Sequence, residues 1–294
     1  GYTLRMFSDS AARVLKEFVF TRPVTLSGGG MFPMGDDMKL MKGRIRFDAS
    51  AGRVRYPLLG TTLDLGRTKG EVLISPQWVV VDKMMGTIWD GTFTGRVLAQ
   101  IDDGDALNGS FVLQDMNLTS IGKSYDKKME KATVHGAIEF SSKGGNMNSI
   151  QAKGEAALVH GDLVEIPLFG FLGEALSNYI PGLGHLINYK ISRADCDFSI
   201  EKGYVRTSNF AAQGSNMSLE GGGWIRLSDL QVNSDFKLGL RGLPGFITSP
   251  VFLLAGGLFQ VRGTGPLSNV SWNFAPFSGG KAPVPPAAAP ARKR

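Results

Sequence analysis

The sequence predicts a mainly β fold, built as a long curved antiparallel sheet that forms an apolar groove, in the manner of a partly open barrel. Three observations support the β class. Many short segments alternate between apolar and polar residues, as strands with one buried face do. Glycine accounts for 39 of the 294 residues and falls between many of these segments, which is typical of a chain with many turns. Helical periodicity is confined to a few short stretches.

The clearest alternation is in Lys131–Ser141, where Ile138 and Phe140 share one side. Another runs from Ala194 to Glu201, with Phe198 and Ile200 on one side and acidic or hydroxyl residues on the other. We count roughly fifteen such segments. A sheet this wide twists, so it must curl or split into packed layers.

Helices are expected at only a few places. Ala11–Phe18 predicts a short N-terminal helix, and 117–131 a loop with a short exposed helix. Two apolar segments, Leu168–Ile187 and Leu243–Phe259, interrupt the strands and are expected to be short helical inserts. Three consecutive glycines at 221–223 predict a β-bulge or a crossing.

We expect one elongated β-groove domain over residues 1–277. Residues 278–294 are rich in Pro and Ala and predict a disordered tail. The formal net charge of +6 depends on that end of the chain, because four of the 32 basic residues lie in 281–294. The remaining 28 basic and 26 acidic residues nearly balance, so we expect no nucleic-acid partner.

The residues do not predict an enzyme. No histidine has a second metal ligand at a suitable spacing, so no metal, cofactor or catalytic group is expected. Asp102, Asp103 and Asp105 lack the later glutamate of a calcium loop and predict a turn. Cys196 is the only cysteine. It alternates with Phe198 and Ile200, which predicts a buried, inert thiol.

The apolar strand faces need a cover, which can be a second sheet, helices or a ligand. The helical inserts are too short to cover the whole inner face, and a bare apolar groove of several hundred Å² is unusual without a partner. Acyl chains are one such partner, since each buried CH₂ contributes about 0.8 kcal/mol. The candidate residues lining the groove or its lips are Ile138, Phe140, Leu158, Leu168, Phe169, Phe171, Leu172, Leu176, Ile180, Leu186, Ile187, Phe198, Ile200, Phe246, Phe252, Leu254 and Phe259.

The order of elements from about residue 130 to 275 resembles the AsmA-like C-terminal region of the AsmA/TamB group of bacterial envelope proteins. Four stretches carry the resemblance. They are Gly154-x-Ala-x-Leu-x-x-Gly161-x-Leu-x-x-Ile166-Pro167-Leu168; Ala194-x-x-x-Phe198-x-Ile200-x-x-Gly203-x-Val205; the strand Gly221–Leu227; and Phe259-Gln-Val261-x-Gly263-Thr-Gly265-Pro266-Leu267. The resemblance assigns residues 130–277 to this region.

The resemblance implies a β groove with an apolar interior and no catalytic residues. It also implies a periplasmic location, anchoring in the inner membrane through a segment outside this chain, and a role in lipid transport and outer membrane biogenesis. The implied partners are phospholipid or another acyl lipid, the membrane surface and other envelope proteins.

Two other classes of function remain open. One is a structural or assembly scaffold of the cell envelope, whose β core is filled by its own side chains and carries no lipid. The other is a carbohydrate-binding or carbohydrate-active β-sandwich. The second needs exposed aromatic residues gathered in one cleft, whereas the four tryptophans, Trp78, Trp89, Trp224 and Trp272, are scattered along the sequence.

Overall fold

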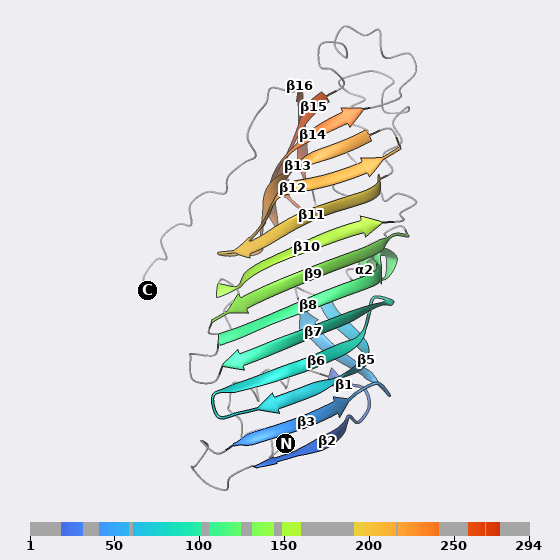
Figure 1. Cartoon of the computed structure of the whole chain (residues 1–294). Coiled ribbons are helices and arrows are strands. Elements are labelled where there is room, and N and C mark those ends of the chain that lie inside the picture. The colour runs from blue at the N-terminus through green and yellow to red at the C-terminus, as the bar shows by residue number, and fades with distance from the viewer. Residues whose placement is uncertain are drawn as a thin grey trace. The chain divides into compact units, whose positions relative to one another are not determined.

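The structure is a computed structural model and describes residues 19–31, 41–58, 61–100, 106–124, 131–143, 149–159, 191–215, 217–240, 258–267 and 269–276. Within these residues, sixteen strands form one long antiparallel sheet that is not closed into a barrel, accompanied by one helix (Figure 1). The predicted β class and antiparallel sheet are therefore confirmed.

The chain divides into two compact units, residues 1–128 with 143–145, and residues 129–142 with 146–294. The expectation of one domain over residues 1–277 stays a prediction. The first unit contains β1 (Val19–Phe20), β2 (Thr25–Met31), β3 (Lys42–Asp48), β4 (Arg53–Leu58), β5 (Thr61–Ile74), β6 (Trp78–Ile88), β7 (Gly91–Gln100), β8 (Ala106–Asn117) and α2 (Leu118–Ser124).

The first unit forks at its longest strand, β5. One edge of β5 pairs with β6, whereas the other edge is divided between two strands. Residues 61–66 pair with β4, and residues 69–74 pair with β3. β1 then extends the β4 branch and β2 extends the β3 branch. The change of partner coincides with a register shift, where Arg67 has a positive φ of 47°.

The helix α2 lies against the hairpin turn between β6 and β7. The turn residues Trp89 and Asp90 have φ values of 48° and 62°, and two such residues are what a tight type I′ hairpin requires. The indole Nε1 of Trp89 donates to Ser124 Oγ at 2.9 Å. Asn117 caps the helix, because its Oδ1 accepts the Thr119 N–H at 2.9 Å. The short helix predicted within 117–131 is therefore confirmed, but its predicted exposure is wrong: Lys123 is exposed, Gly122 is buried and the other helical residues are half-buried.

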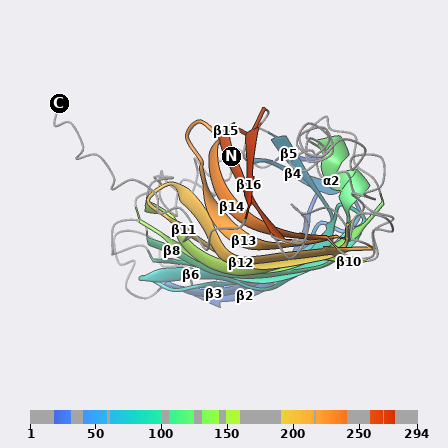
Figure 2. The same ribbon diagram turned by 90° about the horizontal axis from the view of Figure 1, so that it is seen from above.

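The second unit is an up-and-down succession in which each strand pairs with the next. Its strands are β9 (Thr133–Ser142), β10 (Gln151–Val159), β11 (Ile191–Glu201), β12 (Tyr204–Gly214), β13 (Met217–Arg226), β14 (Gln231–Leu240), β15 (Leu258–Pro266) and β16 (Ser271–Pro276). Figure 2 shows that β12 to β16 curve strongly along their length. Lys202 and Gly203, with φ values of 51° and 76°, form the turn between β11 and β12.

Aromatic residues face glycines at six directly paired positions in the two units. In each pair, a β-carbon added to the glycine would lie within 2.3–3.0 Å of an atom of the ring, so the ring occupies the space that a side chain would take. The pairs are Phe47–Gly70, Phe93–Gly86, Phe111–Gly95, Phe198–Gly154, Phe236–Gly221 and Trp272–Gly263. The aromatic side chains are thereby held down against the neighbouring strand.

The structure corrects the interpretation of Gly221–Gly223. These glycines pair without interruption with Ser234–Phe236, so β13 has no extra residue there. The irregularity lies in the neighbouring strand β12, whose register shifts between Thr207 and Phe210 against β13. Added β-carbons at the three glycines would lie 2.2–2.4 Å from carbonyl oxygens of the adjacent strands. Close backbone approach therefore explains this run of glycines.

Most of the predicted helical residues lie outside the described part of the chain. This applies to Ala11–Phe18, to Leu168–Ile187 and to residues 243–257 of the second insert. The end of that second insert is a correction, because Leu258 and Phe259 already belong to strand β15. Their backbone groups are paired there with β14, which excludes a helix at these two positions.

Replacing Gly95 by Ala should lower the free energy of unfolding by about 1–3 kcal/mol, as overpacking does. An added β-carbon would lie 2.3 Å from Phe111 Cδ1 and 2.8 Å from the Ser110 carbonyl oxygen. Gly29→Ala in the same unit is the control, because no atom lies within 4 Å of its added β-carbon. Urea denaturation measures both, and equal stability of the two variants would contradict the ring-over-glycine account.

Candidate functional site

The register of β9, β10 and β11 sorts their residues into two sets. Directly paired residues share a face of the sheet, and successive residues alternate between the faces. One face, here called the apolar face, carries only apolar residues and glycine over most of this length, and the other carries mainly charged and polar residues. The apolar face includes Val134, Ile138, Phe140, Ala152, Gly154, Ala156, Leu158, Ala194, Cys196, Phe198 and Ile200.

The same face continues through β13, β14 and β15. Leu219 pairs with Leu238, which pairs with Phe259, and Phe236 pairs with Val261. These residues are deeply buried, with Leu219 and Val261 at 0% and Leu238 at 1% exposure. By contrast, Ile138, Leu158 and Phe198 on the earlier strands are only partly buried. The apolar face is therefore covered at the later strands and more accessible over β9–β11.

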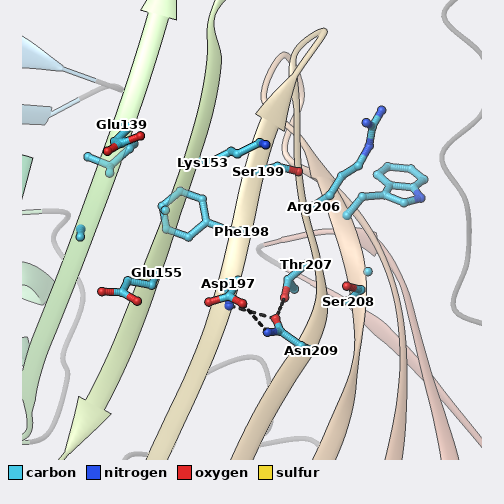
Figure 3. A pocket seen from close by; sticks show the side chains of 15 residues that line it. Glu139, Lys153, Glu155, Asp197, Phe198, Ser199, Arg206, Thr207, Ser208 and Asn209 are labelled. Atoms are coloured by element: carbon cyan, nitrogen blue, oxygen red, sulfur yellow. Dashed lines mark hydrogen bonds between the residues drawn. The ribbon is translucent and has the colours of Figure 1, made fainter. Parts of the chain in front are cut away.

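A bulge in β12 keeps the apolar face continuous. Relative to both neighbours, β12 has one extra residue between Thr207 and Phe210. The Asn209 side chain compensates for the interrupted ladder: its Oδ1 accepts the Asp197 N–H at 2.9 Å, and its Nδ2 donates to Asp197 Oδ2 at 2.7 Å (Figure 3). The extra residue returns Phe210 to the apolar face, where its ring contacts Phe236 edge-on at 5.5 Å.

A depression of about 840 Å³ crosses β9 to β13. Most of its lining belongs to the polar set, including Glu139, Lys153, Glu155, Asp197 and Arg206, and Ile138, Gly154 and Phe198 of the apolar face also contribute (Figure 3). The ring atom Cζ of Phe198 would be 2.5 Å from a β-carbon added to Gly154. The ring therefore leans over β10, where it occupies the space that a side chain at position 154 would fill.

The polar set holds ion pairs. Asp235 is the most buried of its carboxylates, and it accepts hydrogen bonds from Gln260 Nε2 at 2.8 Å and from Arg262 Nη2 at 2.9 Å. His135 belongs to this set through its pairing with Ala157. Within the described ranges, no group of three or more His, Cys, Asp or Glu side chains could hold a metal ion. Asp102, Asp103 and Asp105 lie outside those ranges.

The structure places six of the predicted groove residues on one face of the second unit. Ile138, Phe140, Leu158, Phe198 and Ile200 come together on β9–β11, and Phe259 lies on the same face at β15 with 6% exposure. The other candidates lie outside the described residues: Leu168, Phe169, Phe171, Leu172, Leu176, Ile180, Leu186, Ile187, Phe246, Phe252 and Leu254.

Sequence reasoning missed the aromatic cluster of Phe210, Phe236 and Trp272. Phe236 and Trp272 lie 6.3 Å apart, each above a glycine of the preceding strand. The available signal was the repeated occurrence of single glycines inside alternating segments that also contain one aromatic residue. The tryptophans do not form one cleft in this unit, because Trp224 pairs on the polar face and Trp272 on the apolar face.

Comparisons with protein-family models, curated proteins and solved structures gave no match for this chain. Across the described residues, no helix combines the length and apolar character needed to cross a membrane. The fold thus defines the chain as an antiparallel β-sheet protein whose second unit separates apolar from polar residues on its two faces.

The thiol of Cys196 should ionise at higher pH in the folded protein than in the unfolded chain. Burial raises the pKa of this thiol, and the charges of Asp197 and Asp195 raise it further. Because the thiolate is the reactive form, the rate of alkylation should begin to rise at a higher pH in the native protein. The same chain in urea is the control, and coinciding pH–rate profiles would show that the thiol is not shielded.

Proposed function

We propose that this chain is a non-enzymatic envelope protein that binds phospholipid acyl chains along the apolar face of its second unit. The observation that carries the proposal is the register, which aligns apolar residues on one face across β9, β10 and β11 and continues them into β13–β15. Such a face is partly accessible at Ile138, Leu158 and Phe198. An extended apolar track of this kind matches the shape and chemistry of an acyl chain.

The energetics favour an acyl ligand over a polar one. Each CH₂ group removed from water contributes about 0.8 kcal/mol, so a chain segment a few carbons long gains several kcal/mol. The ring of Phe198 lies over Gly154, so the face presents a broad apolar surface at this position. The ladder pairing of β9–β11 keeps these surfaces aligned, so little ordering of the protein is needed on binding.

The resemblance to the AsmA-like region supplies the proposed setting. In that setting the chain lies in the periplasm, is anchored to the inner membrane by a segment outside this chain, and supports lipid transfer to the outer membrane or its assembly. The groove lips would be the apolar segments 168–187 and 243–257, which lie outside the described residues.

The alternative proposal is an envelope scaffold with a self-filled core. It is favoured by the near-complete burial of Leu219, Leu238 and Val261, because an apolar face that is already covered cannot take up a ligand. The two proposals differ over β9–β11, where the apolar residues are less buried. The carbohydrate-binding alternative has less support, since Trp224 and Trp272 lie on opposite faces of the sheet.

Introducing a charge on the apolar face should remove bound lipid. Phe198→Asp should abolish the acyl lipid found by mass spectrometry in the organic extract of the purified protein, because an unpaired carboxylate is costly to bury beside an acyl chain. Ser199→Asp is the matched control: it introduces the same charge one residue away, on the opposite face. Ile138→Asp tests a second position on the same track. Circular dichroism must show that each variant is folded.

Cys196 gives an independent test without a charge substitution. It is the only cysteine, and it lies on the apolar face between Ala194 and Phe198. Adding a phospholipid to lipid-depleted protein should slow alkylation of the thiol at least tenfold, because an acyl chain above β11 blocks the reagent. Two results together would favour the scaffold proposal over lipid binding. They are a folded Phe198→Asp variant that still carries lipid, and a rate of Cys196 alkylation that does not change when phospholipid is added.

A further inference from the structure

The positive charge of the described residues is concentrated in the first unit. Residues 19–124, within the described ranges, contain eleven Lys and Arg against six Asp and Glu, a net charge of +5. In the second unit the described residues carry eight of each, so the charges cancel. A net charge of one sign in one unit indicates an anionic partner for that unit.

Three cations of the first unit gather around one buried carboxylate. Glu71 on β5 has only 8% of its side chain exposed. Arg44 Nε and Arg46 Nε lie 3.4 and 3.6 Å from Glu71 Oε1, and Lys83 Nζ lies 3.7 Å from Oε2. A single carboxylate neutralises one of the three charges. Because the cationic side chains are 63–73% exposed, the charge in excess faces solvent.

A β-bulge brings Lys83 into this group. Against β7, strand β6 has one extra residue between Val81 and Met84, and Lys83 there has a φ of 50°. In a regular strand, successive side chains alternate between the faces. Lys83 would then lie on the face opposite to Asp82, together with Val81 and Met84. The bulge instead directs its ammonium group towards Glu71, on the opposite face. That face carries Arg44, Arg46, Lys69 and Glu71 and is here called the polar face of the first unit. Bulges that re-aim a side chain are over-represented beside functional sites.

The cluster borders a shallow depression of about 430 Å³. Arg46, Lys69 and Lys83 line it together with the carboxylates of Asp48 and Glu71, so its cations exceed its anions by one. Thr25 and Ser27 of the exposed strand β2 add hydroxyl groups. Guanidinium, ammonium and hydroxyl groups are the donors that proteins use to bind phosphate oxygens. The depression is open and its cations are exposed, which suits a headgroup presented by a surface better than a small anion enclosed in a pocket.

We propose that the polar face over β3, β5 and β6 docks the first unit onto an anionic membrane surface through lipid phosphate groups. Arg44, Arg46, Lys69 and Lys83 contact the phosphates, and Glu71 holds the two arginines and Lys83 together. This surface lies in the first unit and on the polar face, so it does not depend on the acyl-chain track of the second unit.

The test measures sedimentation of the full chain with vesicles of phosphatidylcholine, with and without phosphatidylglycerol. We expect binding only to the anionic vesicles, weakening as salt is added. The double variant Lys69→Gln/Lys83→Gln should bind about 25-fold more weakly, since each basic residue at an anionic surface contributes about fivefold in affinity. It should keep its co-purified acyl lipid, so that failure of docking and failure of the acyl-lipid proposal remain distinguishable.

The control variant Arg22→Gln/Lys123→Gln removes two exposed charges of the same unit that lie outside the cluster. Equal weakening by the two double variants would overturn the proposal, because only net charge would then matter. Binding of inorganic phosphate, measured by titration calorimetry, without vesicle binding would also overturn it and indicate a site for free phosphate. Absence of binding to anionic vesicles at low salt would overturn it outright.

Discussion

An aromatic ring lying across a glycine of the paired strand is the contact on which this sheet depends. A strand interior normally loses stability at glycine, which offers no side chain to pack. Here six rings occupy the vacant space, so the apolar surface that glycine fails to provide comes from its cross-strand partner. The arrangement fixes register as well, because a slip of one residue would place each ring against a β-carbon or on the wrong face.

Two of the bulges, in β12 and β6, show how one extra residue keeps the side chains that follow it on the correct face of the sheet. In β12, Asn209 is accommodated by bonding to Asp197, and Phe210 returns to the aromatic cluster. In β6, the extra residue moves Lys83 to the polar side. Without these insertions an apolar residue would reach the polar face, or a cation the apolar one. The separation of the two faces is therefore maintained by local irregularity as much as by strict alternation.

Much of this architecture could be predicted from the sequence, because alternation is a local property. The strand around Ile138 and Phe140, the turn at Lys202 and Gly203, and the short helix after Asn117 all follow from neighbouring residues. What could not be predicted depends on pairing between distant residues. Gly221–Gly223 predicted a bulge in their own strand, whereas the partner strand β12 contains it. The cluster at Glu71 likewise unites residues from three strands, and no spacing in the sequence signals it.

The fork at β5 has a consequence for how this protein behaves in a crowded solution. A sheet that ended in one long strand would offer neighbouring molecules a continuous row of backbone donors and acceptors, which invites intermolecular association. Dividing that border between β3 and β4 ends the first unit in two short strands, one of them only two residues long and the other containing three consecutive glycines. Neither is as long as β5, so the branching shortens the continuous edge that a foreign strand could pair with.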